Sequence, residues 1–176
     1  MIAPHPAAVL FDRDGTLIHD EPYCANPDLV RPVPSAAPAL DLLRSAGIRI
    51  GVITNQSGIA RGLIPPDRAR AVDARVAELL GPFDTWQVCP HGPADGCRSR
   101  KPEPGMVLAA AAELGVSPRR MAVIGDIGAD VGAAAAAGAR SVLVPTPVTR
   151  RQEIVDAPVV RKDLVAAVRY VLGDRW

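Results

Sequence analysis

The chain has 176 residues, a length that suits one domain spanning 1–176. Lys and Arg number 20 against 19 Asp and Glu, so the formal net charge is +1, and hydrophobic residues make up 48% with only 3% aromatic. This balance excludes the electrostatic footprint of a nucleic-acid or membrane partner, so any affinity for phosphate has to come from a local site.

The sequence carries no sign of export or membrane insertion. No apolar run reaches the ~18 residues of a membrane span, and the start, 1–11, lacks the basic region of a signal peptide. Cys24, Cys89 and Cys97 are too few for a disulfide framework. We therefore expect a cytoplasmic, monomeric protein with reduced thiols.

The first half of the chain alternates short apolar runs with helical patterns. Residues 7–11 predict a buried strand, and the proline-containing stretch 19–34 predicts a loop. Ser35 is expected to cap a helix that runs to about residue 46. Residues 48–53 predict a second strand, Pro65 and Pro66 open a helix to about residue 80, and 85–88 predict a third strand.

The second half continues the alternation. Residues 89–104 form a loop that contains the cysteines and histidine discussed below, and 105–114 predict a helix. A strand at 121–124, a helix at 130–137, a strand at 141–144 and a helix at 163–172 follow. Alternating strands and helices predict an α/β fold, a Rossmann-like three-layer sandwich with a mainly parallel sheet.

Polar residues follow three of the predicted strands. In chain order they are Asp12 and Asp14, then Thr54 and Asn55, and finally Asp126. Ligands of open parallel sheets bind beyond the carboxyl ends of the strands, so these groups are expected to converge. Lys101, in the loop before a helix, could reach the same crevice. Each residue alone is equally typical of a turn, a cap or a surface charge.

The combination matches phosphoryl transfer to a carboxylate. Asp12 can be the nucleophile and a magnesium ligand together, and Asp14 can act as acid and then as base. Asp126 supplies a further hard oxygen ligand. Lys101 and Thr54 suit the oxygens of a phosphoryl group.

Four segments, in order, resemble the motifs of the haloacid dehalogenase superfamily. They are FDRDGTL at 11–17, VITNQSGIARG at 52–62, RKPEPGM at 100–106 and IGDIGAD at 124–130. The stretch TNQSGIARG and the following Cys-Pro-His at 89–91 are similar to the heptose bisphosphate and histidinol phosphatase branch. That branch has no large cap domain, which agrees with the short gaps between the motifs.

The resemblance implies a magnesium-dependent phosphatase that acts through an aspartyl-phosphate on Asp12, with Asp14 as acid and base. It implies a small sugar phosphate as substrate, a heptose bisphosphate first, with histidinol phosphate or another small phosphomonoester as the alternative. By the same resemblance, Thr54 and Lys101 hold the phosphoryl group and Arg100 recognises substrate. The remaining implied residues are the magnesium ligands Asp12, Asp126 and the carbonyl of Asp14, the supporting Asp130, and the substrate contacts Asn55, Gln56, Ser57 and 20–23.

Two positions depart from the branch. Ile127 stands where the heptose phosphatases typically have a lysine. The loop that typically binds zinc keeps Cys89, His91 and Cys97 but has Ser99 at the fourth ligand position. Zinc completed by Asp95 or water, a metal-free loop and a simple thiol pair are all consistent with this pattern.

A different functional class, the receiver domain of a phospho-acceptor switch, also uses an aspartate, a hydroxyl residue and a lysine on a parallel sheet. Receivers usually carry the acceptor aspartate after the third strand, and here that strand ends at Cys89. A catalytically dead phosphatase is disfavoured because both Asp12 and Asp14 are present. We therefore expect an enzyme.

Overall fold

The computed structural model describes residues 5–173. Five strands form one sheet in the order β3-β2-β1-β4-β5, and every pair is parallel. Their bounds are β1 Ala8–Phe11, β2 Arg49–Asn55, β3 Thr85–Cys89, β4 Met121–Gly125 and β5 Arg140–Leu143. The predicted α/β sandwich is confirmed, with a sheet that is entirely parallel.

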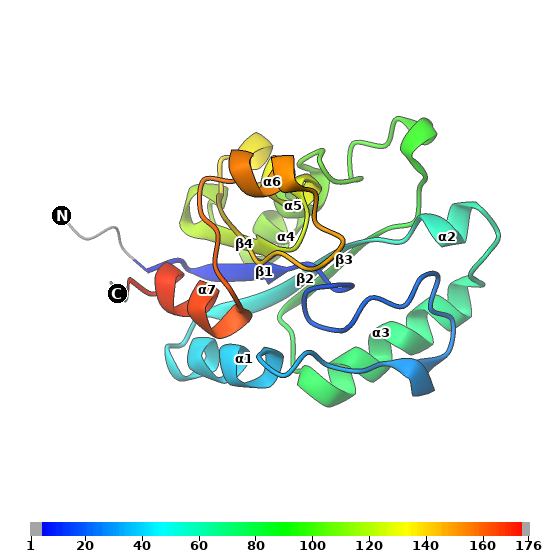
Figure 1. The fold of residues 1–176 in the computed structure, drawn as a ribbon, viewed down its shortest axis with the longest axis horizontal. Coiled ribbons are helices and arrows are strands. Elements are labelled where there is room, and N and C mark those ends of the chain that lie inside the picture. Colours follow the sequence, from blue (N-terminus) through cyan, green and yellow to red (C-terminus); the bar gives the residue numbers. More distant parts are fainter. Residues whose placement is uncertain (1–4, 174–176) are drawn as a thin grey trace.

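Helices cover both faces of the sheet (Figure 1). On one face lie α1 Ala36–Ser45, α3 Pro66–Leu80 and α7 Leu164–Val171, and on the other lie α4 Gly105–Leu114 and α5 Gly128–Ala137. Two short helices, α2 Ser57–Ala60 and α6 Arg151–Asp156, lie in connections. Three 3-10 turns complete the described chain: η1 Pro27–Leu29, η2 Pro93–Asp95 and η3 Pro118–Arg120.

The central strand β1 shows why both faces need covering. Val9 and Phe11 belong to the apolar cluster with α1, α3 and α7, whereas Ala8 and Leu10 belong to the cluster with α4 and α5. A strand buried on both faces reads as a continuous apolar run, as 7–11 does. Within residues 5–173 no inserted cap domain interrupts this arrangement, and no helix is both long and apolar enough to cross a membrane.

Several predicted boundaries need correction. The Ser35 side chain does not cap α1, because its hydroxyl accepts a hydrogen bond from Leu164 N at 3.4 Å and so ties α1 to α7. Helix α5 begins at Gly128 rather than at residue 130, which puts Asp130 in its first turn. The loop 19–34 contains η1 and the loop 89–104 contains η2.

Candidate active site

Because the strands are parallel, their carboxyl ends meet at one edge of the sheet. Asp12 directly follows β1, Asp126 directly follows β4, and Asn55 is the last residue of β2. These three side chains help to line a hollow of about 180 Å³. The other lining residues are Asp14, Asp20, Lys101, Ile127 and Val148.

Lys101 connects the carboxyl edge of the sheet to α5. Its Nζ lies 2.7 Å from Asp12 Oδ1 and 2.6 Å from Asp130 Oδ1, and it donates a third hydrogen bond to the carbonyl of Ile53 at 3.0 Å. All three ammonium hydrogens are thereby used. Burial opposes the charged form, but the carboxylates of Asp12 and Asp130 outweigh it and raise the pKa of Lys101.

Three buried carboxylates gather around this ammonium. Oxygens of Asp12, Asp126 and Asp130 lie within 4.8 Å of one another. Burial, which outweighs the opposing effect of the Lys101 ammonium, raises the pKa of Asp12 well above its ordinary value, and the neighbouring carboxylates add to this rise. Burial and Asp130 raise the pKa of Asp126 to about 7. Three carboxylates facing one ammonium form a hard-oxygen set that suits a divalent cation such as Mg²⁺.

Asp14 is held apart from that cluster. Arg13 Nε lies 3.2 Å and 3.1 Å from the two carboxylate oxygens of Asp14. From the other side Gln56 Nε2 donates to Asp14 Oδ2 at 2.7 Å and to Thr54 Oγ1 at 2.9 Å. Asp14 thus lines the hollow with its carboxylate held by Arg13 and Gln56, and its side chain is more exposed (22%) than that of Asp12 (10%).

Two glycines allow the acidic residues to pack this closely. Gly15 has φ +78°, and a Cβ there would lie 2.5 Å from Asp126 Oδ2. A Cβ on Gly125 would lie 2.2 Å from Asp130 Cγ. Gly15 of FDRDGTL and Gly125 of IGDIGAD are therefore required by contact with the carboxylates.

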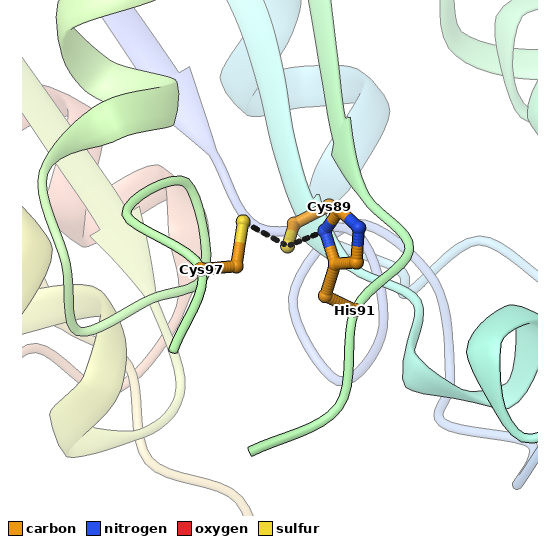
Figure 2. A group of neighbouring side chains, drawn as sticks. All are labelled: Cys89, His91 and Cys97. Carbon is orange, nitrogen blue, oxygen red and sulfur yellow. Dashed lines mark hydrogen bonds between the residues drawn. The ribbon is translucent and has the colours of Figure 1, made fainter. Parts of the chain in front are cut away.

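A second group of ligand-type side chains lies at the end of β3 (Figure 2). Cys89 Sγ is 3.9 Å from His91 Nδ1 and 3.8 Å from Cys97 Sγ. Burial raises the pKa of the Cys89 thiol, whereas the backbone N–H of Ser99 lowers that of Cys97. Asp95 is already engaged, since its Oδ2 accepts from Gly92 N at 2.7 Å. Two thiols and an imidazole brought together in this way suit zinc.

The chain shares its fold and most of its length with known phosphatases. The HAD-hydrolase-like family model matches residues 98–169. The D-glycero-beta-D-manno-heptose-1,7-bisphosphate 7-phosphatase of Pseudomonas putida is 36% identical over 172 residues, which cover 93% of this chain and 98% of the relative. This chain belongs to the HAD-like hydrolase family.

Further relatives of this HAD-like phosphatase carry the same name. The Rhodopseudomonas palustris enzyme is 38% identical over 147 residues, covering 77% of this chain and 82% of the relative. The crystal structure of the D,D-heptose 1,7-bisphosphate phosphatase of Bordetella bronchiseptica, complexed with magnesium and phosphate, superposes with a TM-score of 0.83 at 31% identity. That likeness covers 96% of this chain and 99% of the other.

Not every predicted residue of this HAD-like phosphatase lines the hollow at Asp12. Gln56 and Ser57 line a neighbouring hollow of about 270 Å³, which shares Asp14, Asp20 and Asn55 with the first. Arg100 lines a third hollow beside Lys101 and Cys97, and its Nη1 donates to the His91 carbonyl at 3.0 Å.

Sequence reasoning overlooked three residues at the site. Thr16 Oγ1 donates to Asp126 Oδ1 at 3.4 Å, and Thr149 Oγ1 donates to the Asp126 carbonyl at 2.6 Å. The third overlooked residue is Arg13, whose guanidinium donates hydrogen bonds to the Asp14 carboxylate. It was overlooked even though Arg13 is part of the FDRDGTL motif. The position of Arg13 between two aspartates was a usable signal. For Thr149, in a connection after β5, the sequence offered none.

Proposed function

We propose that this chain, acting as a single domain, is a sugar-phosphate phosphatase that hydrolyses D-glycero-D-manno-heptose 1,7-bisphosphate. One observation carries the proposal: a chain that aligns almost end to end with a heptose bisphosphate phosphatase holds Asp12 against Lys101 in a hollow ringed by carboxylates. The fold alone would support many phosphatase substrates. The near-complete alignment favours the heptose bisphosphate.

In the proposed reaction a carboxylate oxygen of Asp12 attacks phosphorus, and the bond from phosphorus to the sugar oxygen breaks. Asp14 gives its proton to that leaving oxygen. Water then attacks the phosphorus of the aspartyl-phosphate, Asp14 takes the proton of the water, and Asp12 is released with inorganic phosphate. The hydrogen bond from Lys101 Nζ to Asp12 Oδ1 holds the carboxylate of the nucleophile in one orientation before the attack.

The carboxylate cluster is proposed to hold Mg²⁺, with Asp12, Asp126 and the carbonyl of Asp14 as ligands. When bound, the ion offsets the repulsion between the nucleophilic carboxylate and the phosphate. Asp130 is proposed to support this set: one of its oxygens accepts from Lys101 Nζ, and the other accepts from Ile127 N at 3.2 Å.

Cys89, His91 and Cys97 are proposed to hold zinc, with water rather than Ser99 or Asp95 as the fourth ligand. The distances among the three side chains support this ligand set, and the hydrogen bond from Gly92 N occupies Asp95. Such a site would be structural. It would brace the segment that carries Arg100 and Lys101.

A substrate screen with magnesium tests the proposal. The panel contains heptose 1,7-bisphosphate, other sugar phosphates and histidinol phosphate, and the measured quantity is kcat/KM. We expect the heptose bisphosphate to be the best substrate. If histidinol phosphate is about tenfold better, equivalent to ~1.4 kcal/mol in transition-state binding, the substrate assignment is wrong. The resemblance to the heptose phosphatases implies a lysine at position 127, where this chain has isoleucine, so the comparison with histidinol phosphate is needed.

A further inference from the structure

Arg13 is the largest fully buried side chain among residues 5–173, at 1% exposed. Its guanidinium contacts Asp14 on one side and Asp73 on the other. Taking charges out of water is costly, and buried ion pairs can often be replaced by apolar residues of similar volume without loss of stability. Stability alone therefore does not account for an arginine at this position.

The guanidinium contacts Asp14 through two of its nitrogens. Nε bridges both carboxylate oxygens, and Nη2 lies 3.1 Å from Oδ1 and 3.0 Å from Oδ2. Arg side chains hold carboxylates in a defined plane because their donors form a rigid fork. Gln56 Nε2 also donates to Asp14 Oδ2, and the Asp14 side chain lines the hollow and stays 22% exposed.

Asp73 contacts the remaining end of the guanidinium. It lies on α3, sixty residues along the chain from Arg13, and its Oδ1 is 2.5 Å from Arg13 Nη1. Its side chain is 17% exposed, so this contact lies largely out of water. Within the described residues, Asp73 makes no hydrogen bond to Asp14. The two carboxylates are connected only because both accept hydrogen bonds from the Arg13 guanidinium. Helix α3 is thereby linked to the acid–base residue.

We propose that Arg13 and Asp73 are positioning residues: Asp73 orients the guanidinium, which in turn aims the carboxyl of Asp14 at the leaving oxygen. This inference rests on the proposed function, since it assumes that Asp14 protonates that oxygen. The inference predicts different effects on substrates whose leaving groups differ in their need for a proton. A sugar alkoxide needs the proton of Asp14 in order to leave, whereas para-nitrophenolate leaves without it.

The experiment measures kcat/KM of Asp73→Asn with magnesium on heptose 1,7-bisphosphate and on para-nitrophenyl phosphate. This parameter covers the steps up to phosphoryl transfer and the departure of the leaving group. We expect a loss of about tenfold or more on the sugar ester, a part of the ~100-fold or greater benefit of general acid catalysis, and less than about twofold on the aryl ester. Asp67→Asn is the matched control, because Asp67 is exposed on the same helix.

An equal loss on both esters, a larger loss on the aryl ester or no loss on either overturns the inference. Arg13→Lys, which keeps the charge but not the fork, should show the same split between the two esters, and a thermal melt establishes that each variant is folded. If the wild type hydrolyses no sugar phosphate, the proposed function fails separately. The comparison is then made with the best alkyl phosphate in the screen.

Discussion

Asn55 and Lys101 exchange two hydrogen bonds, although 46 residues separate them in the chain. Asn55 Nδ2 donates to the Lys101 carbonyl, and Lys101 N donates to Asn55 Oδ1, both at 3.1 Å. The Asn55 side chain thus satisfies both the backbone N–H and the backbone carbonyl of Lys101, as a neighbouring strand would. It fixes the peptide from which the Lys101 ammonium reaches Asp12.

Asn55→Ala should therefore impair catalysis more than substrate binding. Losing two partly buried hydrogen bonds is expected to cost about 1–3 kcal/mol, and hence to lower Tm by several degrees. We expect kcat on a sugar phosphate to fall at least about tenfold, because Lys101 loses its fixed position beside Asp12. Asn26→Ala, in the loop before α1, is the control. Unchanged kcat with a lowered Tm would limit Asn55 to a structural role.

Asp12→Asn should abolish turnover and leave the fold intact. Turnover is lost because an amide cannot attack phosphorus. Tm should stay near that of the wild type, because the variant also relieves repulsion among the three clustered carboxylates. Phosphate release and a thermal melt measure the two quantities. Asp41→Asn, which neutralises an exposed carboxylate on α1, is the matched control. Residual activity above a few per cent, roughly 2 kcal/mol of the barrier, would remove Asp12 from its assigned role.

Strands β1, β2 and β4 could be predicted because each is an apolar run with a polar residue at its carboxyl end, and the same pattern indicated the polar residues that line the hollow. The spacing places Asp73 on the buried stripe of α3, beside Ala69 and Val76. The Arg13–Asp73 pair could still not be predicted, because nothing in the sequence identifies a partner sixty residues away. Helices α2 and α6 have four and six residues, too few for a helical period. Ser35 had the right residue type for a cap, but packing against α7 engages its hydroxyl.

Removing magnesium should abolish activity reversibly. Asp12, Asp126 and Asp130 present three carboxylates, and Lys101 supplies a single positive charge among them, so a phosphate would be repelled without a further cation. Chelation followed by magnesium or calcium addition tests this. We expect magnesium alone to restore turnover, since Ca²⁺ prefers longer and more numerous bonds. Asp126→Ala should raise the magnesium concentration needed for half-maximal rate. Full activity in excess chelator would contradict the mechanism.

Gly15→Ala should inactivate the enzyme, because its Cβ would meet the Asp126 carboxylate. Gly62→Ala is a matched control: Gly62 has φ +68°, similar to the +78° of Gly15, yet a Cβ on Gly62 would meet nothing within 4 Å. Both variants should lose about 1 kcal/mol of stability from the left-handed backbone. The difference between them in kcat/KM isolates the contact with Asp126. Equal activities in the two variants would show that this contact is unimportant.

Elemental analysis of protein purified without chelator tests the zinc site. We expect near-stoichiometric zinc in the wild type, none in Cys97→Ala, and retention in Cys24→Ala, whose thiol lies elsewhere in the core. Ser99→Cys should slow loss of zinc to a chelator and raise Tm, because a fourth thiolate completes the tetrahedron. Absence of zinc from both the wild type and Ser99→Cys would show that the loop folds without metal.

The enclosure of the Lys101 ammonium also determines how the protein can be handled chemically. The sequence contains one other lysine, Lys162, which is exposed just before α7. Amine-directed reagents require a neutral, accessible amine, and Lys101 offers neither while two carboxylates enclose it. Coupling to a surface through lysine should therefore attach the protein beside α7 and leave the catalytic edge of the sheet unmodified and open to substrate.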